Sequence, residues 1–194
     1  MLIENNQIKS ELIDVLEKCI SLGLEKAAKV IGELVDSDVS LNTAKVYLTD
    51  GTIKFPLFSE RVIVQEMNGE ALSGKTVFSM GDDELIKLIK YLEGFDEIDI
   101  EDEESFDLLI DTYHEIGNII LGNIISTMVD FLNLRVDIKV PYLTTQKIFD
   151  LSDNINFLIV DVLFKIDKLD IEGKLFLVND YNSYLNLMEL VDES

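Results

Sequence analysis

The sequence predicts a mixed α/β (α+β) fold in a single domain, residues 1–194, built from two copies of one helix-strand-strand-strand-helix unit. Three observations favour this fold. Helix-like and strand-like segments follow in that order twice, and residues about 97 positions apart match at several points. A long apolar segment, residues 105–132, opens the second copy and has the composition of a buried central helix. We therefore expect a mostly antiparallel sheet with paired central helices on one side.

The first copy covers residues 1–95 approximately. Residues 4–18 and 24–35 have helical periodicity, and Gly23 between them is expected to break or bend the helix. Strand-like segments follow at 39–48, 60–67 and 75–80, separated by turn-like residues 50–56 and 68–74. Residues 81–94 then predict a short amphipathic helix that ends at Gly94.

The second copy covers residues 98–194 approximately. The central helix is followed by strand-like segments at 134–140, 155–167 and 173–178, and by a helix at 181–191. At a shift of 97, Asp14 matches Asp111 and Leu34 matches Phe131. At a shift of 99, Gly74-Lys75 matches Gly173-Lys174, as expected for one hairpin present twice.

One polar stripe interrupts the apolar central helix. Asp111, Glu115, Asn118, Gly122 and Ser126 follow at spacings of four, three, four and four, which places them on one helical face. A carboxylate and an amide one turn apart, followed by small residues, indicate a surface that another molecule approaches closely.

The same residues carry a resemblance to a known family. Asp111, Glu115 and Asn118 form a D-x-x-x-E-x-x-N pattern, and Pro141 follows after 22 intervening residues. This pattern resembles the signature of the CheC/CheX/FliY chemotaxis phosphatases. Gly122-Asn123 match the family's next helical residues.

The resemblance implies an activity, a partner and roles for four residues. Such proteins hydrolyse the aspartyl phosphate of a CheY-type response regulator in two-component signalling. Asn118 would be catalytic by positioning the attacking water, and Glu115 by anchoring the partner's phosphate-binding lysine. Asp111 and Gly122 would contribute to partner binding. No cofactor of its own is implied, because the regulator supplies the Mg²⁺. The alternative is a non-catalytic module of the same fold that holds a response regulator or a CheD-like deamidase.

The first copy lacks these residues. Lys18 and Ser21 stand at the positions of Glu115 and Asn118, and Ala44 stands at that of Pro141. Only Asp14, at the position of Asp111, has the same residue type in both copies. Because lysine reverses the charge of Glu115 and serine is shorter than asparagine, the first copy should not perform the same chemistry. It is either retained only for packing or has a separate binding role.

A nucleotide-binding motif competes with this interpretation. Residues 69–76 satisfy the P-loop pattern G-x-x-x-x-G-K-[ST], and the strand ending at Asp161 resembles a Walker B strand. A P-loop requires a helix to begin at its Lys-Thr pair. Since Lys75-Thr76 lead into a strand-like segment, the sequence argues against nucleotide binding.

Two single residues are candidates for reactive groups. His114 is the only histidine, and Asp111 three residues earlier gives one metal-pair spacing, but no second pair exists for a two-metal site. A surface or boundary position is expected for His114, and no metal site is expected. Cys19, the only cysteine, is expected to be a buried apolar residue.

Composition limits the partners and the location. A net charge of −22 opposes binding to nucleic acid or to anionic membranes. With a single cysteine, no secretion signal and no apolar stretch long enough to span a bilayer, a cytoplasmic protein is expected. The internal symmetry removes one reason to dimerise, so a monomer is expected.

Overall fold

The computed structural model describes residues 10–50, 61–70, 72–99, 101–145 and 156–192. Residues 4–9 of the helix predicted at 4–18, and residues 51–56 of the turn predicted at 50–56, lie outside the described part of the chain. The helices are α1 (Ser10–Val35), α2 (Asp82–Glu93), α3 (Glu103–Phe131) and α4 (Tyr181–Asp192). The strands are β1 (Val39–Asp50), β2 (Arg61–Gly69), β3 (Gly74–Met80), β4 (Val136–Ile138), β5 (Tyr142–Thr145), β6 (Asn156–Ile166) and β7 (Ile171–Asp180).

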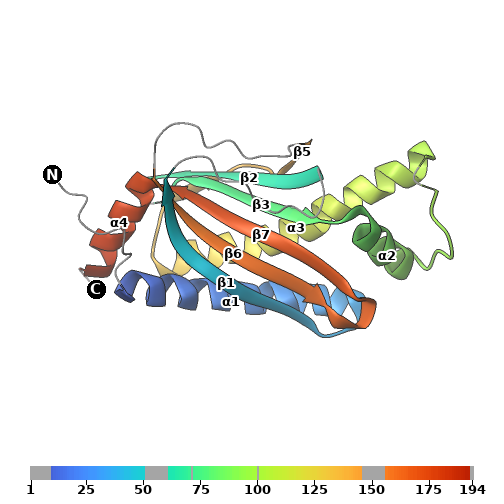
Figure 1. Cartoon of the computed structure of the whole chain (residues 1–194), viewed down its shortest axis with the longest axis horizontal. Helices are drawn as coiled ribbons and strands as arrows, with labels where there is room; N and C mark the ends of the chain where they lie inside the picture. The colour runs from blue at the N-terminus through green and yellow to red at the C-terminus, as the bar shows by residue number, and fades with distance from the viewer. Residues whose placement is uncertain (1–9, 51–60, 71, 100, 146–155, 193–194) are drawn as a thin grey trace.

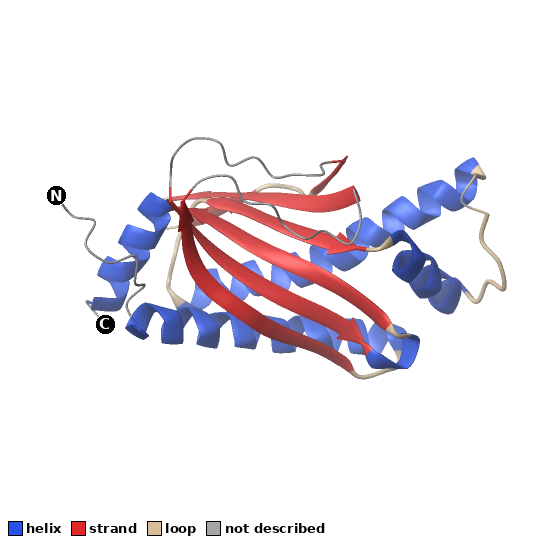
Figure 2. Cartoon of the chain, viewed as in Figure 1, coloured by secondary structure: helices blue, strands red, loops and turns tan. Residues whose placement is uncertain are grey.

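Within the described residues the strands form one sheet in the order β1-β6-β7-β3-β2-β4, and β5 also pairs with β2. Every pairing in this sheet is antiparallel. Figure 1 shows α1 and α3 side by side along one face of the sheet, with α2 and α4 near opposite ends. Figure 2 shows the resulting two layers, one of strands and one of helices. The mixed, mostly antiparallel fold with paired central helices is therefore confirmed.

The main core lies between the helix pair and the sheet. Aromatic side chains join the layers, because the Phe78 ring lies 5.6 Å from that of Tyr113 and 6.0 Å from that of Phe164. The α3 side chains in this core are Leu109, Tyr113, Ile116, Ile120, Leu121, Ile124, Ile125 and Met128. They surround much of the helix because α3 contacts α1 on one side and the sheet on another.

The predicted helix break at Gly23 is wrong. α1 runs without interruption through Gly23, and the glycine is buried where α1 meets α3. A Cβ at Gly23 would lie 2.7 Å from the Cα of Ile124. The glycine therefore permits close helix packing, a requirement that helix propensity alone does not reveal.

The two halves agree in backbone detail at the shift of 97. α1 is followed by Asp36 with φ 44°, and α3 is followed 97 residues later by Asn133 with φ 50°. Both ends have the Schellman hydrogen bond, from Ser37 N–H to Gly32 O at 3.1 Å and from Leu134 N–H to Val129 O at 2.8 Å. These features are what a duplication would leave, and the duplication itself stays a prediction.

Two further predictions concern the strands and the P-loop pattern. Lys75 and Thr76 lie inside β3, so no helix begins where a P-loop would need one. The strand predicted at 134–140 is present but shorter, as β4 (Val136–Ile138). The strand β5 was not predicted from the sequence. Among the described helices, none is both long and apolar enough to cross a membrane.

Candidate functional site

The helix that carries the polar stripe has well-formed ends. At its N-terminus, the side chain of Asp102 accepts a hydrogen bond from Ser105 N–H at 3.0 Å, and Glu103 and Glu104 follow in the first turn. Negative charge there interacts favourably with the helix dipole. Midway along α3, the Tyr113 hydroxyl accepts from Met80 N–H at 3.1 Å and lies 3.0 Å from Phe78 O. These contacts fix the helix against the sheet.

The predicted stripe lies on the side of α3 that faces away from the core. Asp111, Glu115, Asn118 and Ser126 are exposed, and Gly122 is half-buried. A Cβ at Gly122 would meet no atom of the described residues within 4 Å. The single accessible face expected from the spacing is therefore present, with open space above its glycine.

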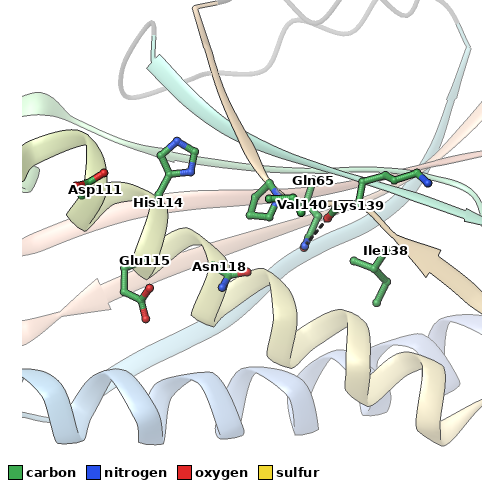
Figure 3. A pocket seen from close by; sticks show the side chains of 9 residues that line it. Gln65, Asp111, His114, Glu115, Asn118, Ile138, Lys139 and Val140 are labelled. Carbon is green, nitrogen blue, oxygen red and sulfur yellow. Dashed lines mark hydrogen bonds between the residues drawn. The ribbon is translucent and has the colours of Figure 1, made fainter. Parts of the chain in front are cut away.

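A pocket of about 630 Å³ lies over this stripe. Its lining residues are Gln65, Asp111, His114, Glu115, Asn118, Ile138, Lys139, Val140 and Pro141. Figure 3 shows that α3 supplies one side of the pocket and that the segment between β4 and β5 supplies another. The fold thus brings Pro141 to the same pocket as Glu115 and Asn118, whereas Gly122 lies outside the lining.

The segment containing Pro141 is a bulge in the edge of the sheet. Ile138 pairs with Met67 and Tyr142 pairs with Val64, so three residues, 139–141, face only two on β2. Proline fits such a position because it has no backbone N–H to contribute to the sheet.

Two hydrogen bonds hold the bulge to β2. The N–H of Lys139 donates to Glu66 O at 2.9 Å. Gln65 Nε2 donates to Lys139 O at 3.0 Å, the bond that is dashed in Figure 3. Sequence reasoning missed Gln65 because it lies on another strand. Its only sequence signal is a polar residue inside an apolar strand.

The charged groups at the bulge are largely paired. Lys139 forms an ion pair with Asp137, which raises the pKa of Lys139. Glu66 forms one with Lys75 at 3.0 Å, and the hydrogen bond from Lys75 lowers the pKa of Glu66. Burial raises the pKa of Tyr142, whose hydroxyl lies 3.3 Å from Glu66.

Glu115 and Asn118 on α3 differ from these paired groups. Within the described part of the chain, the side chains of Glu115 and Asn118 make no hydrogen bond or ion pair. Both are therefore available to another molecule.

His114 is half-buried in the pocket lining, as expected of a boundary residue. In the described residues, no group of three or more His, Cys, Asp or Glu side chains is arranged to hold a metal ion. Cys19 is fully buried, in agreement with its predicted role as an apolar residue.

The equivalent face of the first copy is accessible but differs in chemistry. Asp14, Lys18 and Ser21 are exposed on α1, and Lys18 Nζ lies 5.3 Å from the centre of the Phe131 ring. The strand β1 carries an irregularity between Thr43 and Lys45, at the position of Ala44. This copy thus has the bulge without the Glu, Asn and Pro of the second.

The residues of this pocket coincide with a known family pattern. A model described as the CheC-like family matches residues 111–144, which include Asp111, Glu115, Asn118 and Pro141. The CheY-P phosphatase CheC of Bacillus subtilis (strain 168) is 24% identical over 201 residues, covering 94% of this chain and 94% of that protein. The family-model match, this relative and the solved structures described next together support a likeness to the CheC/CheX/FliY family.

Solved structures share the CheC-like fold over most of their length. Thermotoga maritima FliY matches with a TM-score of 0.68 at 15% identity, covering 100% of this chain and 99% of that one. A chain of the FliM-SpeE complex from H. pylori matches with a TM-score of 0.63 at 13% identity, covering 96% and 98%. A chain of the CheX-CheY-BeF3-Mg²⁺ complex from Borrelia burgdorferi matches with a TM-score of 0.57 at 15% identity, covering 90% and 99%. At these identities, the likeness establishes the fold.

Proposed function

We propose that this CheC-like chain is a phosphatase that hydrolyses the aspartyl phosphate of a CheY-type response regulator in chemotaxis signalling. The observation that carries the proposal is the pair Glu115 and Asn118. They are exposed one turn apart on a helix anchored in the core, they line one pocket, and no described residue engages their side chains. The name of the Bacillus subtilis relative, a CheY-P phosphatase, supports the same activity.

In this proposal, Asn118 positions the attacking water. A primary amide both donates and accepts hydrogen bonds, so it can hold a water in line with the phosphorus without forming a covalent bond. The water oxygen bonds to phosphorus while the bond from phosphorus to the aspartyl oxygen breaks. The products are inorganic phosphate and the free carboxylate, which is a good leaving group.

Glu115 anchors the partner in this proposal. A carboxylate one turn before the amide is suited to a charge-assisted hydrogen bond with a lysine beside the phosphoryl group. Asp111 adds negative charge on the same face, and Gly122 leaves space for the partner's backbone. The regulator supplies the Mg²⁺. A cytoplasmic location and a monomeric state are part of the same proposal.

The decisive experiment follows the decay of a phosphorylated CheY-type regulator in the presence of Mg²⁺. The wild type should accelerate the decay, and the double variant Glu115→Ala/Asn118→Ala should not. A matched control is Lys18→Ala/Ser21→Ala, which changes the equivalent exposed positions of the first copy and should retain full activity. Full activity in Asn118→Ala alone would exclude the proposed role of the amide.

A binding module without catalysis is the second candidate. A chain with the same fold was solved in the FliM-SpeE complex from H. pylori, and the first copy here lacks the Glu and Asn. Such a module would hold a response regulator or a CheD-like deamidase. Association of the chain with the regulator without faster decay would favour this alternative.

A further inference from the structure

The bulge 139–141 presents an unusually exposed apolar side chain beside the proposed catalytic pair. Val140 has 84% of its surface exposed, more than the neighbouring Ile138 at 38% and Tyr142 at 41%. Burial in a folded chain normally removes much of such a side chain from water. Val140 lines the same pocket as Glu115 and Asn118, so any molecule docked on that pair comes close to it.

Val140 is held in place by the residues around it. Pro141 fixes its own backbone angle φ and restricts the conformation of Val140 before it. Both backbone groups of Lys139 are hydrogen-bonded. Its N–H donates to Glu66 O at 2.9 Å, and its carbonyl oxygen accepts from Gln65 Nε2 at 3.0 Å. The exposed valine is therefore presented by a fixed bulge.

The first copy indicates that Gln65 is not needed to form a bulge. The equivalent irregularity, around Ala44 in β1, lies opposite β6, where Val162 pairs with Thr43. Val162 corresponds to Gln65 at the shift of 97 and is fully buried. Gln65 is itself only 4% exposed, and among the described residues its Oε1 has no hydrogen-bond partner. A buried, unpaired oxygen opposes folding, and valine would avoid that penalty. This points to a role for Gln65 at the pocket.

We propose that the bulge 139–141, with Val140 at its tip, is a second docking element for the receiver domain of the regulator, and that Gln65 is the residue that positions it. The inference rests on the proposed function. The chemistry of this face defines the partner surface, a basic group for Glu115 and Asp111 beside an apolar recess for Val140. An apolar contact next to a charged one would add to the affinity of the complex without taking part in the chemical step.

The first test measures binding separately from catalysis. The dissociation constant for a regulator loaded with beryllofluoride and Mg²⁺, and the KM and kcat for the phosphorylated regulator, are compared between the wild type and Val140→Ser. We expect the dissociation constant and KM to rise about tenfold, as for a buried interface contact, with kcat retained. Leu185→Ser is the matched control, because Leu185 is an exposed leucine on α4 that does not line the pocket.

The second test addresses Gln65. Gln65→Met is close in size but cannot donate to Lys139 O, so KM should rise several-fold with little change in kcat. Thr127→Val is its control, because Thr127 is also 4% exposed with an unpaired oxygen but lies outside the pocket lining. Both variants should retain the fold, and only the first should weaken docking.

The outcomes distinguish this inference from the proposed function. Unchanged binding by Val140→Ser, or an equal loss in Leu185→Ser, would overturn the docking element while wild-type phosphatase activity stands. Weaker docking by Val140→Ser but not by Gln65→Met would remove the positioning role of Gln65. If the wild type binds the regulator without accelerating its decay, the proposed catalysis fails and the docking element is still tested by the dissociation constants.

Discussion

The Cα of Ile124 lies so close to Gly23 that a Cβ on the glycine would approach it to 2.7 Å. The carbonyl oxygen of Asn123 would lie 3.2 Å away from the same atom. Both neighbours belong to the backbone of α3, so a side chain at Gly23 cannot be accommodated by a rotamer change. The two central helices are thus in direct backbone contact, and the position of the polar stripe depends on this contact.

Gly23→Ala should destabilise the protein. Although alanine favours the helix by roughly 1 kcal/mol, the methyl group must push the α3 backbone away, and such overpacking costs roughly 1 to 3 kcal/mol. Urea unfolding should therefore give a lower free energy of unfolding than for the wild type. An increase in stability would mean that the helices separate without strain.

Gly122→Ala should have the opposite effect on stability. Gly122, like Gly23, lies in the interior of a helix, here α3, but a Cβ at Gly122 meets no atom of the described residues within 4 Å, so a gain of about 0.5 to 1 kcal/mol is expected. If the partner's backbone approaches Gly122, the same variant should show a higher KM for the phosphorylated regulator. Unchanged kinetics in the stabilised variant would remove Gly122 from the partner-binding face.

Tyr113→Phe should destabilise the protein by roughly 1 to 3 kcal/mol, because it leaves Met80 N–H without its acceptor in the core. The Tyr113 hydroxyl can also donate to Arg61 O at 3.1 Å or to Phe78 O at 3.0 Å. Thermal unfolding measures the loss. Tyr91→Phe is the control, since its exposed hydroxyl accepts from Lys168 Nζ and can be replaced by water.

Asp36→Gly should stabilise the protein. Asp36 follows α1 with φ 44°, a conformation that glycine adopts at less cost, and its charge opposes the negative end of the helix dipole. Asn133→Gly, at the equivalent end of α3, should give a smaller gain because asparagine tolerates this conformation and is uncharged. Melting temperatures of the two variants compare the effects, and equal gains would argue against the contribution of charge.

The stability of the protein should fall between pH 9 and pH 11, in part because of Cys19. Burial raises the pKa of this thiol from 9.0 to about 11. Above pH 9 the thiol ionises first in the unfolded chain, so its stabilising contribution is present below pH 9 and lost as the pH approaches 11.

One such group changes the free energy of unfolding by up to about 1.4 kcal/mol per pH unit. Cys19→Ala lacks this group, so its stability should fall less steeply in urea titrations across the same range. Tyr113 also has a pKa raised by burial, but it is present in both proteins. Parallel pH curves would contradict the assignment to Cys19.

Much of the fold was predictable because its signals are local. The 3.6-residue and two-residue periodicities located α3, α2 and most strands to within a few residues. The hairpin of β6 and β7 and that of β2 and β3 followed from two similar segments of sequence. The strand β5 was missed because its four residues, Tyr142–Thr145, are too few for a clear alternation.

The sequence by itself determined that Asp111, Glu115 and Asn118 share one accessible helix face, because spacings of three and four residues fix direction within a helix. The resemblance to the CheC/CheX/FliY signature also implied that Pro141 belongs with them. Only the tertiary structure decided that the bulge lies against this face, that Gln65 holds it, and that Gly23 is a contact with α3. These relationships depend on strand register and on helix packing between residues far apart in the chain, which no local pattern specifies.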